Sequence, residues 1–136
     1  MENKSEQRSG SDVALHSAID SLLETALAAG HFQALYLYSM DGLPIARAGD
    51  LDIRLGNGLL EVALIILEIK NAGARPGGPE DLYEVVVEGT NKVRFIYRMV
   101  NFLDRPALLA VIIPTRRAYR GVVNRLQKAI AGLDAD

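Results

Sequence analysis

The chain contains no cysteine and only two histidines among its 136 residues. The absence of cysteine excludes a disulfide framework, thiolate catalysis and a cysteine-ligated zinc site. His16 and His31 fall on and just after the first predicted helix, where we expect them on the surface. No Ser/His/Asp cluster or metal-ligand spacing accompanies them. The sequence therefore predicts no metal, no cofactor and no catalytic site.

A strong charge of one sign and a long apolar run are also missing. The net charge is −2, from 15 basic and 17 acidic residues, so no strong field attracts nucleic acid. The uninterrupted apolar run 62–67 is far shorter than the roughly 20 residues of a membrane-spanning helix. The glycine-rich segment 73–79 is not followed by Lys-Ser/Thr and does not match a phosphate-binding loop. We expect neither nucleic-acid binding nor direct membrane insertion.

What is present is enough apolar material for one compact domain, with 49% apolar and 24% charged residues. Residues 1–10 are polar and lack the apolar core of a secretory signal, so we expect them to form a disordered leader. We expect a single domain over residues 11–133 and a short tail over residues 134–136. The expected location is cytoplasmic.

The rest of the chain must accommodate a predicted helix over residues 51–72 that is apolar on two faces. At roughly 100° per residue, one face holds Leu51, Leu55, Leu59, Val62, Ile66 and Ile69, and the other holds Ile53, Leu60, Ala63, Leu64 and Leu67. The polar seam between them consists of Arg54, Asn57, Glu61 and Glu68. A helix that is apolar around most of its circumference must be covered on both faces or span a membrane, and the short apolar run excludes the span.

Before this helix the sequence predicts one further helix and two strands. The first helix is expected to begin at Ser11 or Asp12, either of which can cap helix amides. Residues 34–38 are apolar on both strand faces, which predicts a central strand. Residues 43–48 form the second predicted strand, at a sheet edge because Pro44 cannot donate to a ladder.

A hairpin is predicted for residues 82–88 and 92–100. A three-residue loop pairs Glu88 with Lys92 and brings the apolar residues of both strands to one face, whereas a two-residue loop would place them on opposite faces. The other face then gathers Glu84, Glu88, Lys92, Arg94 and Arg98. We expect a mixed-charge surface there, with cross-strand ion pairs worth roughly a few tenths of a kcal/mol each.

The chain is predicted to end with a strand and a helix. Residues 107–113 include no polar side chain and predict another central strand. Pro114-Thr115 is expected to open the last helix, whose polar side is dominated by Arg116, Arg117, Arg120, Arg125 and Lys128. Without interleaved exposed aromatics, such a basic face is typical of a solvated surface rather than of a nucleic-acid site.

The predicted order is helix, strand, strand, helix, strand, strand, strand, helix. With this order the chain resembles the roadblock family, relatives of dynein light chains that include the bacterial MglB-type regulators of small GTPases. The resemblance is carried by the strand and Asp-Gly-Leu-Pro-Ile-Ala hairpin of residues 34–46, the long apolar helix, the three-strand meander and the closing helix around residues 124–130. It covers residues 12–133, with a longer segment than usual at 73–79.

The resemblance implies an α/β (α+β) sandwich of the roadblock/profilin-like kind. Its five-stranded, mostly antiparallel sheet has the expected strand order 2-1-5-4-3, with helices 1 and 3 on one face and helix 2 on the other. Similar proteins cover the outer side of helix 2 with a second copy, so a homodimer is implied. The expected interface residues are Leu60, Ala63, Leu64, Leu67, Leu82, Glu84 and Val86. The alternative is a helix covered wholly within its own monomer.

The resemblance also implies a function. We expect a non-enzymatic interaction module that regulates or scaffolds a small Ras-like GTPase and at most activates that partner's hydrolysis. The expected partner-binding residues are Arg54, Asn57, Glu61 and Glu68. Arg47, Arg54 and Arg75 are candidates for an inserted arginine, although arginines near turns usually serve solubility. The alternative is a small-ligand sensor or an enzyme on a similar fold, against which stand the large strand side chains and the missing catalytic cluster.

Overall fold

The computed structural model describes residues 2–49, 53–71, 82–89, 92–114 and 116–134, with the backbone alone for residues 2–12 and 53. The elements are α1 (Glu2–Gly30), β1 (Ala34–Ser39), β2 (Pro44–Gly49), α2 (Ile53–Asn71), β3 (Glu84–Glu88), β4 (Val93–Phe102), β5 (Arg105–Pro114) and α3 (Arg120–Ala131). This order confirms the predicted one. No helix in these ranges is long and apolar enough to cross a membrane.

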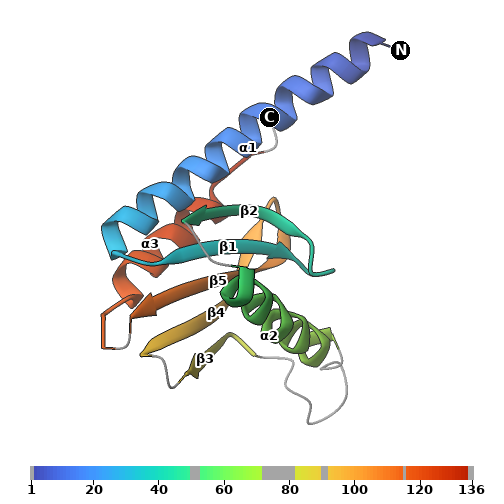
Figure 1. The fold of residues 1–136 in the computed structure, drawn as a ribbon. Coiled ribbons are helices and arrows are strands. Elements are labelled where there is room, and N and C mark those ends of the chain that lie inside the picture. Colours follow the sequence, from blue (N-terminus) through green and yellow to red (C-terminus); the bar gives the residue numbers. More distant parts are fainter. Residues whose placement is uncertain (1, 50–52, 72–81, 90–91, 115, 135–136) are drawn as a thin grey trace.

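The five strands form one antiparallel sheet in the order β2-β1-β5-β4-β3, as expected (Figure 1). The strand β5 lies in the middle, where both of its faces are covered, and its seven consecutive apolar residues from Ala107 to Ile113 are buried. Pro44 begins β2 at one edge of the sheet, where its missing N–H does not interrupt a central ladder. Both strand placements predicted from residue type are therefore confirmed.

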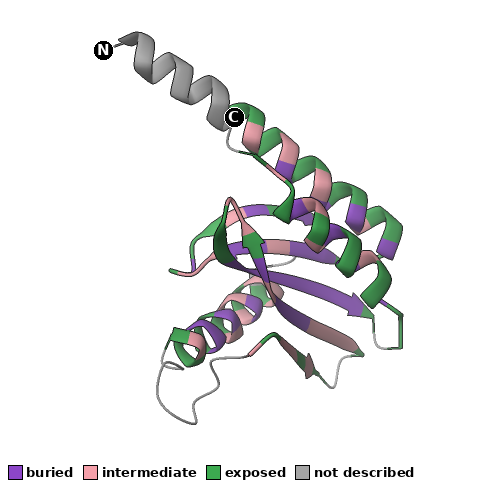
Figure 2. Cartoon of the chain, turned by 180° about the vertical axis from the view of Figure 1, so that it is seen from behind, coloured by how far each residue is buried: buried purple, intermediate pink, exposed green. Residues whose placement is uncertain are grey.

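Two layers of helix cover the sheet, α1 and α3 on one face and α2 on the other (Figure 1). Alternation along β1 serves both layers, because Leu35 and Leu37 pack towards α1 and α3 while Tyr36 and Tyr38 pack towards α2. The predicted sandwich is confirmed. Figure 2 shows the buried residues concentrated in the central strands and on the sheet-facing sides of the helices.

The first helix differs from its predicted start. It begins at Glu2 rather than at Ser11 or Asp12, and its first turns extend beyond the sheet (Figure 1). The expected leader is rich in good helix formers such as Glu and Lys, so the helix anchored at Ile19 and Leu23 continues through it. The leader is thus helical in the structure, while the division into a domain over residues 11–133 and a tail over residues 134–136 stays a prediction.

The pairing of β3 with β4 corrects the predicted register. Glu88 lies opposite Arg94 instead of Lys92, a shift of two residues that keeps Val85 and Val87 on the same face as the apolar side chains of β4. Lys92 has a φ of 64°, in the left-handed region, and therefore cannot continue a strand ladder. The three-residue loop also predicts a left-handed conformation for Asn91, which lies outside the described residues.

The last helix begins later than predicted, at Arg120 rather than at Pro114-Thr115. Arg116 has a φ of 78°, which is incompatible with a right-handed helix, and the Arg117 N–H donates to the Pro114 carbonyl across a turn, 3.3 Å. Thr115, the segment 73–79 and Asp50, whose side chain is a candidate cap for α2, lie outside the described residues.

Candidate interaction surface

The inner side of α2 is narrower than the two predicted apolar faces. Leu59, Ala63, Ile66 and Leu67 are buried against the sheet, with Ala63 and Leu67 at 0% and 3% exposure. The Tyr97 hydroxyl also donates to the Leu59 carbonyl, 2.8 Å, from the middle of this contact. The buried stripe contains residues of both predicted faces, because the boundary between these two faces points towards the sheet.

The outer side of α2 leaves three large apolar side chains uncovered. Leu64, Ile65 and Ile69 are 46%, 55% and 42% exposed. The whole predicted seam is exposed between them: Arg54, Asn57, Glu61 and Glu68. At helical spacing Leu64 lies on one side of this seam, and Ile65 and Ile69 lie on the other. We call this set of exposed residues the outer face of α2.

The predicted interface residues on α2 therefore separate. Leu64 lies on the outer face and Leu60 is half-buried at its border, whereas Ala63 and Leu67 are already covered by the chain's own sheet. Ile65, which the division into two faces left unassigned, is the most exposed of the three apolar residues. Helical spacing places Ile65 between Leu64 and Ile69 around the helix, so its exposure could have been predicted once the side facing the sheet was known.

The strand β3 is the last strand in the sheet order, and among the described strands only β4 pairs with it. Its second edge has no partner within the described ranges, and such an edge can pair with another strand. Of the predicted interface residues near it, Leu82 and Glu84 are half-buried and Val86 is 43% exposed. Tyr83 adds a side chain that is 51% exposed. Apolar surface is thus available at this edge as well as on α2.

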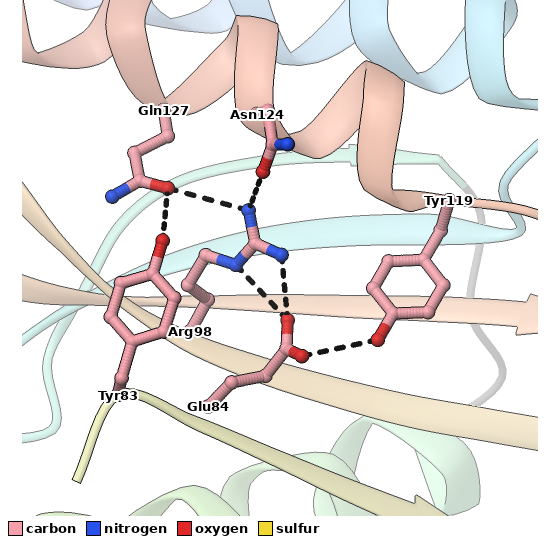
Figure 3. A network of polar contacts seen from close by, with 6 residues as sticks. All are labelled: Tyr83, Glu84, Arg98, Tyr119, Asn124 and Gln127. Atoms are coloured by element: carbon pink, nitrogen blue, oxygen red, sulfur yellow. Dashed lines mark hydrogen bonds and ion pairs between the residues drawn. The ribbon is translucent and has the colours of Figure 1, made fainter.

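Glu84 is tied into a polar network instead of a surface ion pair (Figure 3). One of its oxygens accepts from Arg98 Nε and Nη2 at 3.0 and 2.8 Å, and the other accepts from the Tyr119 hydroxyl at 3.1 Å. Arg98 is only 3% exposed. The prediction of an exposed mixed-charge surface is wrong for Glu84 and Arg98, because α3 packs over them.

Further contacts connect the same network to α3. Arg98 Nη1 donates to Asn124 Oδ1 and to Gln127 Oε1, the latter at 3.3 Å, and the Tyr83 hydroxyl donates to Gln127 Oε1 at 2.9 Å (Figure 3). Burial raises the pKa of Tyr119 above its usual range, and the neighbouring Glu84 carboxylate raises it further. The network fixes β3, β4 and α3 relative to one another, so Glu84 has a structural role.

The remaining predicted candidates do not form one site, although His16 of α1 and Arg47 of β2 line the same groove. Arg47, His16, His31 and Asp41 are exposed on different elements, and Arg75 lies outside the described residues. No group of three or more metal-ligating side chains occurs in the part of the chain that the structure describes. The feature that stands out among the described residues is the exposed apolar surface of α2 and the β3 edge.

Comparison with known proteins gives no match to a family model and none to a curated protein. Solved structures do match. MglB of Myxococcus xanthus superposes with a TM-score of 0.70 at 16% identity, over 85% of this chain and 86% of that one. The gliding protein MglB of Thermus thermophilus gives 0.68 at 17% identity, over 87% and 89%. A Roadblock/LC7 domain of Streptomyces avermitilis gives 0.55 at 22% identity, over 82% and 88%.

The chain has the roadblock fold. This confirms the resemblance at the level of the fold, since the roadblock structures match in the order and layering of the elements over most of both chains. Identities of 16% to 22% establish the roadblock fold alone.

Proposed function

We propose that this chain is a non-enzymatic, homodimeric interaction module that regulates or scaffolds a small Ras-like GTPase. The roadblock fold it shares with MglB, and the resemblance to MglB-type regulators of small GTPases, support the choice of partner. One of the similar structures is described as MglB with a tetrameric arrangement, at a TM-score of 0.67, which supports assembly of copies.

The observation that carries the proposal is where the exposed apolar side chains gather. Among the described residues, seven large apolar side chains are exposed, and five of them lie on α2 or at the β3 edge: Leu64, Ile65, Ile69, Tyr83 and Val86. Covering half of an aliphatic side chain contributes roughly 1 kcal/mol. A two-fold axis applies this gain twice, which can exceed the free-energy cost of association.

The GTPase is proposed to dock beside the dimer axis. Two copies of α2 would place their seams on either side of a shallow groove, with Arg54, Asn57, Glu61 and Glu68 at its border. A symmetric dimer offers such a groove once, so one GTPase per dimer is the expected stoichiometry. Charges at a rim mainly alter association rate and salt dependence, which makes them suited to choosing a partner.

Light scattering of the purified protein tests the dimer. The wild type should have twice the monomer mass at micromolar concentration, and Ile65→Asp should be monomeric or aggregate because it places a charge in the interface. Val13→Asp is the matched control, since Val13 is 67% exposed on α1, which covers the sheet face opposite α2. A monomeric wild type would overturn the dimer.

Calorimetric titration with a Ras-like GTPase from the same organism, loaded with GTP or GDP, tests the partner. Reversing Arg54 and Glu61 together should weaken binding while the dimer mass stays unchanged. Reversing Arg120 and Arg125 on α3 is the control and should leave binding intact. The opposite pattern would move the docking site to α3, and no binding to any such GTPase would remove the partner.

A further inference from the structure

Four arginines lie near the junction of β5 and α3, on the sheet face opposite α2. Arg94 belongs to β4, Arg116 and Arg117 to the connection, and Arg120 begins α3. We call these residues the arginine cluster. Arg116, Arg117 and Arg120 are exposed, and Arg94 is half-buried.

Two members of the cluster are held in place by contacts with one aromatic ring. The guanidinium carbons of Arg94 and Arg120 lie 5.5 and 5.3 Å from the centroid of the Tyr119 ring, which is itself buried. Arg94 Nη2 also donates to the Arg117 carbonyl, 2.6 Å, so β4 is tied directly to the connection. Two guanidinium groups are thus positioned before any ligand arrives.

No carboxylate of the described residues neutralises this charge. The one ion pair within 4.0 Å among them joins Arg98 to Glu84, so Glu84, the acidic residue in contact with Tyr119, is already engaged. Glu88 is the cross-strand neighbour of Arg94, but its oxygens lie beyond that limit. Arg94 Nε is buried and has no hydrogen-bond partner in the described structure. Four positive side chains therefore remain without an acidic partner in a chain whose net charge is −2.

We infer that the arginine cluster binds an acidic segment of a partner protein. Guanidinium groups form paired hydrogen bonds with carboxylates, and the positioned Arg94 and Arg120 reduce the entropy lost on binding. This surface and the outer face of α2 lie on opposite sides of the sheet, so both can be occupied at once. The inference does not depend on the dimer or on the GTPase.

The same observations disfavour other polyanions. Nucleic-acid sites interleave exposed aromatics with basic residues, but the one aromatic side chain placed within the cluster, Tyr119, is buried beneath it at 4% exposure. The overall negative charge also opposes a long uniform polyanion. A membrane surface would favour adjacent exposed apolar anchors, whereas the residue between Arg117 and Tyr119 is the small Ala118.

Fluorescence anisotropy with a labelled octaglutamate peptide at low salt tests the inference. The wild type should bind this peptide and not octaglutamine. Arg116→Glu with Arg117→Glu should weaken binding at least about tenfold, because both side chains are exposed and their reversal repels the peptide. Arg47→Glu with Arg105→Glu is the matched control, since it makes the same change of net charge at exposed residues of β2 and β5.

The control pair should change the affinity less than about twofold, which separates a local site from general attraction. Equal weakening by both pairs would overturn the inference, as would absence of binding by the wild type. A labelled single-stranded oligothymidylate of equal charge, and phosphatidylserine vesicles, provide the other arms. Tighter binding of either than of the peptide would replace the acidic segment with nucleic acid or membrane.

Discussion

Arg98 donates to one oxygen of Glu84 through both Nε and Nη2, at 3.0 and 2.8 Å. The pair joins neighbouring strands, and α3 closes over it, so the side chains are only 4% and 17% exposed. Removing one member of an ion pair this far from water strongly destabilises the folded protein, because the remaining buried charge loses its compensation. It differs in this respect from an exposed cross-strand pair, which contributes little.

Glu84→Val should lower the free energy of unfolding by about 3 kcal/mol, because it leaves the Arg98 guanidinium buried without its carboxylate. The double variant Glu84→Val with Arg98→Met should lose less than the single variant, since no unpaired buried charge remains. Urea denaturation measures both. Glu88→Val on the same strand is the control, with an expected effect within about 0.5 kcal/mol because Glu88 is exposed. Equal effects at residues 84 and 88 would contradict the structural role of the network.

Adjacent residues of α2 should respond differently to the same substitution. Ala63→Asp buries a charge against the sheet, where Ala63 has 0% exposure, and should unfold the chain. Leu64→Asp places the charge on the outer face and should leave the monomer folded while removing self-association. Circular dichroism and light scattering distinguish the two outcomes. If Leu64→Asp unfolded the chain as Ala63→Asp does, the orientation of α2 on the sheet would be wrong.

Buried tyrosines should make the fold sensitive to alkali. Burial raises the pKa of Tyr38 and of Tyr97 above the usual value, and a neighbouring tyrosine raises each further. In the unfolded chain these hydroxyls ionise near about pH 10. Because the folded-state pKa is the higher one, their stabilising contribution is complete below about pH 10 and is lost as the pH rises above it.

Urea denaturation across this pH range should therefore show the free energy of unfolding falling above about pH 10. Tyr97→Phe should make that fall shallower, while lowering stability by about 1 kcal/mol at neutral pH through loss of the hydrogen bond to Leu59. A fall of unchanged slope in Tyr97→Phe would show that other groups control the alkaline transition.

The β4–β5 turn offers a stabilising substitution. Leu103 and Asp104 form the two-residue connection between the paired Phe102 and Arg105, with φ values of 52° and 62°. Such turns favour glycine or asparagine. Asp104→Gly relieves a left-handed strain of roughly 1–2 kcal/mol and costs about 0.5–1 kcal/mol of chain entropy, so the free energy of unfolding should rise by about 0.5–1 kcal/mol. Gly42→Ala is the opposite case, because its φ is 81° and an added Cβ would lie 2.5 Å from Leu64 Cδ2. Thermal melting should move upward for the first variant and downward for the second.

The purified chain alone should bind neither GTP nor ATP and should hydrolyse neither. The expectation follows from the absence of a phosphate-binding loop in the sequence, where no Lys-Ser/Thr follows the glycine-rich segment 73–79. Calorimetry with each nucleotide measures this directly. Saturable binding of either nucleotide would favour a ligand-binding function over the proposed interaction module.

The sequence alone determined the order of the elements and the placement of the strands most marked by composition. The run of apolar residues in β5 requires cover on both faces, and Pro44 requires an edge, because each property acts through the local backbone or through burial of consecutive residues. The polar seam of α2 was likewise predictable, since helical spacing places its residues on one side whatever packs against the other.

The tertiary structure alone decided which arc of α2 faces the sheet, because a helix that is apolar on two faces can be rotated without changing its pattern. This rotation buries Ala63 and Leu67 and exposes Ile65. Alternation within β3 and β4 defined the face of each residue but not the register, since a shift of two residues keeps every side chain on the same face. The burial of Glu84 and Arg98 depended on α3, a helix more than twenty residues away along the chain, so no local pattern could predict it.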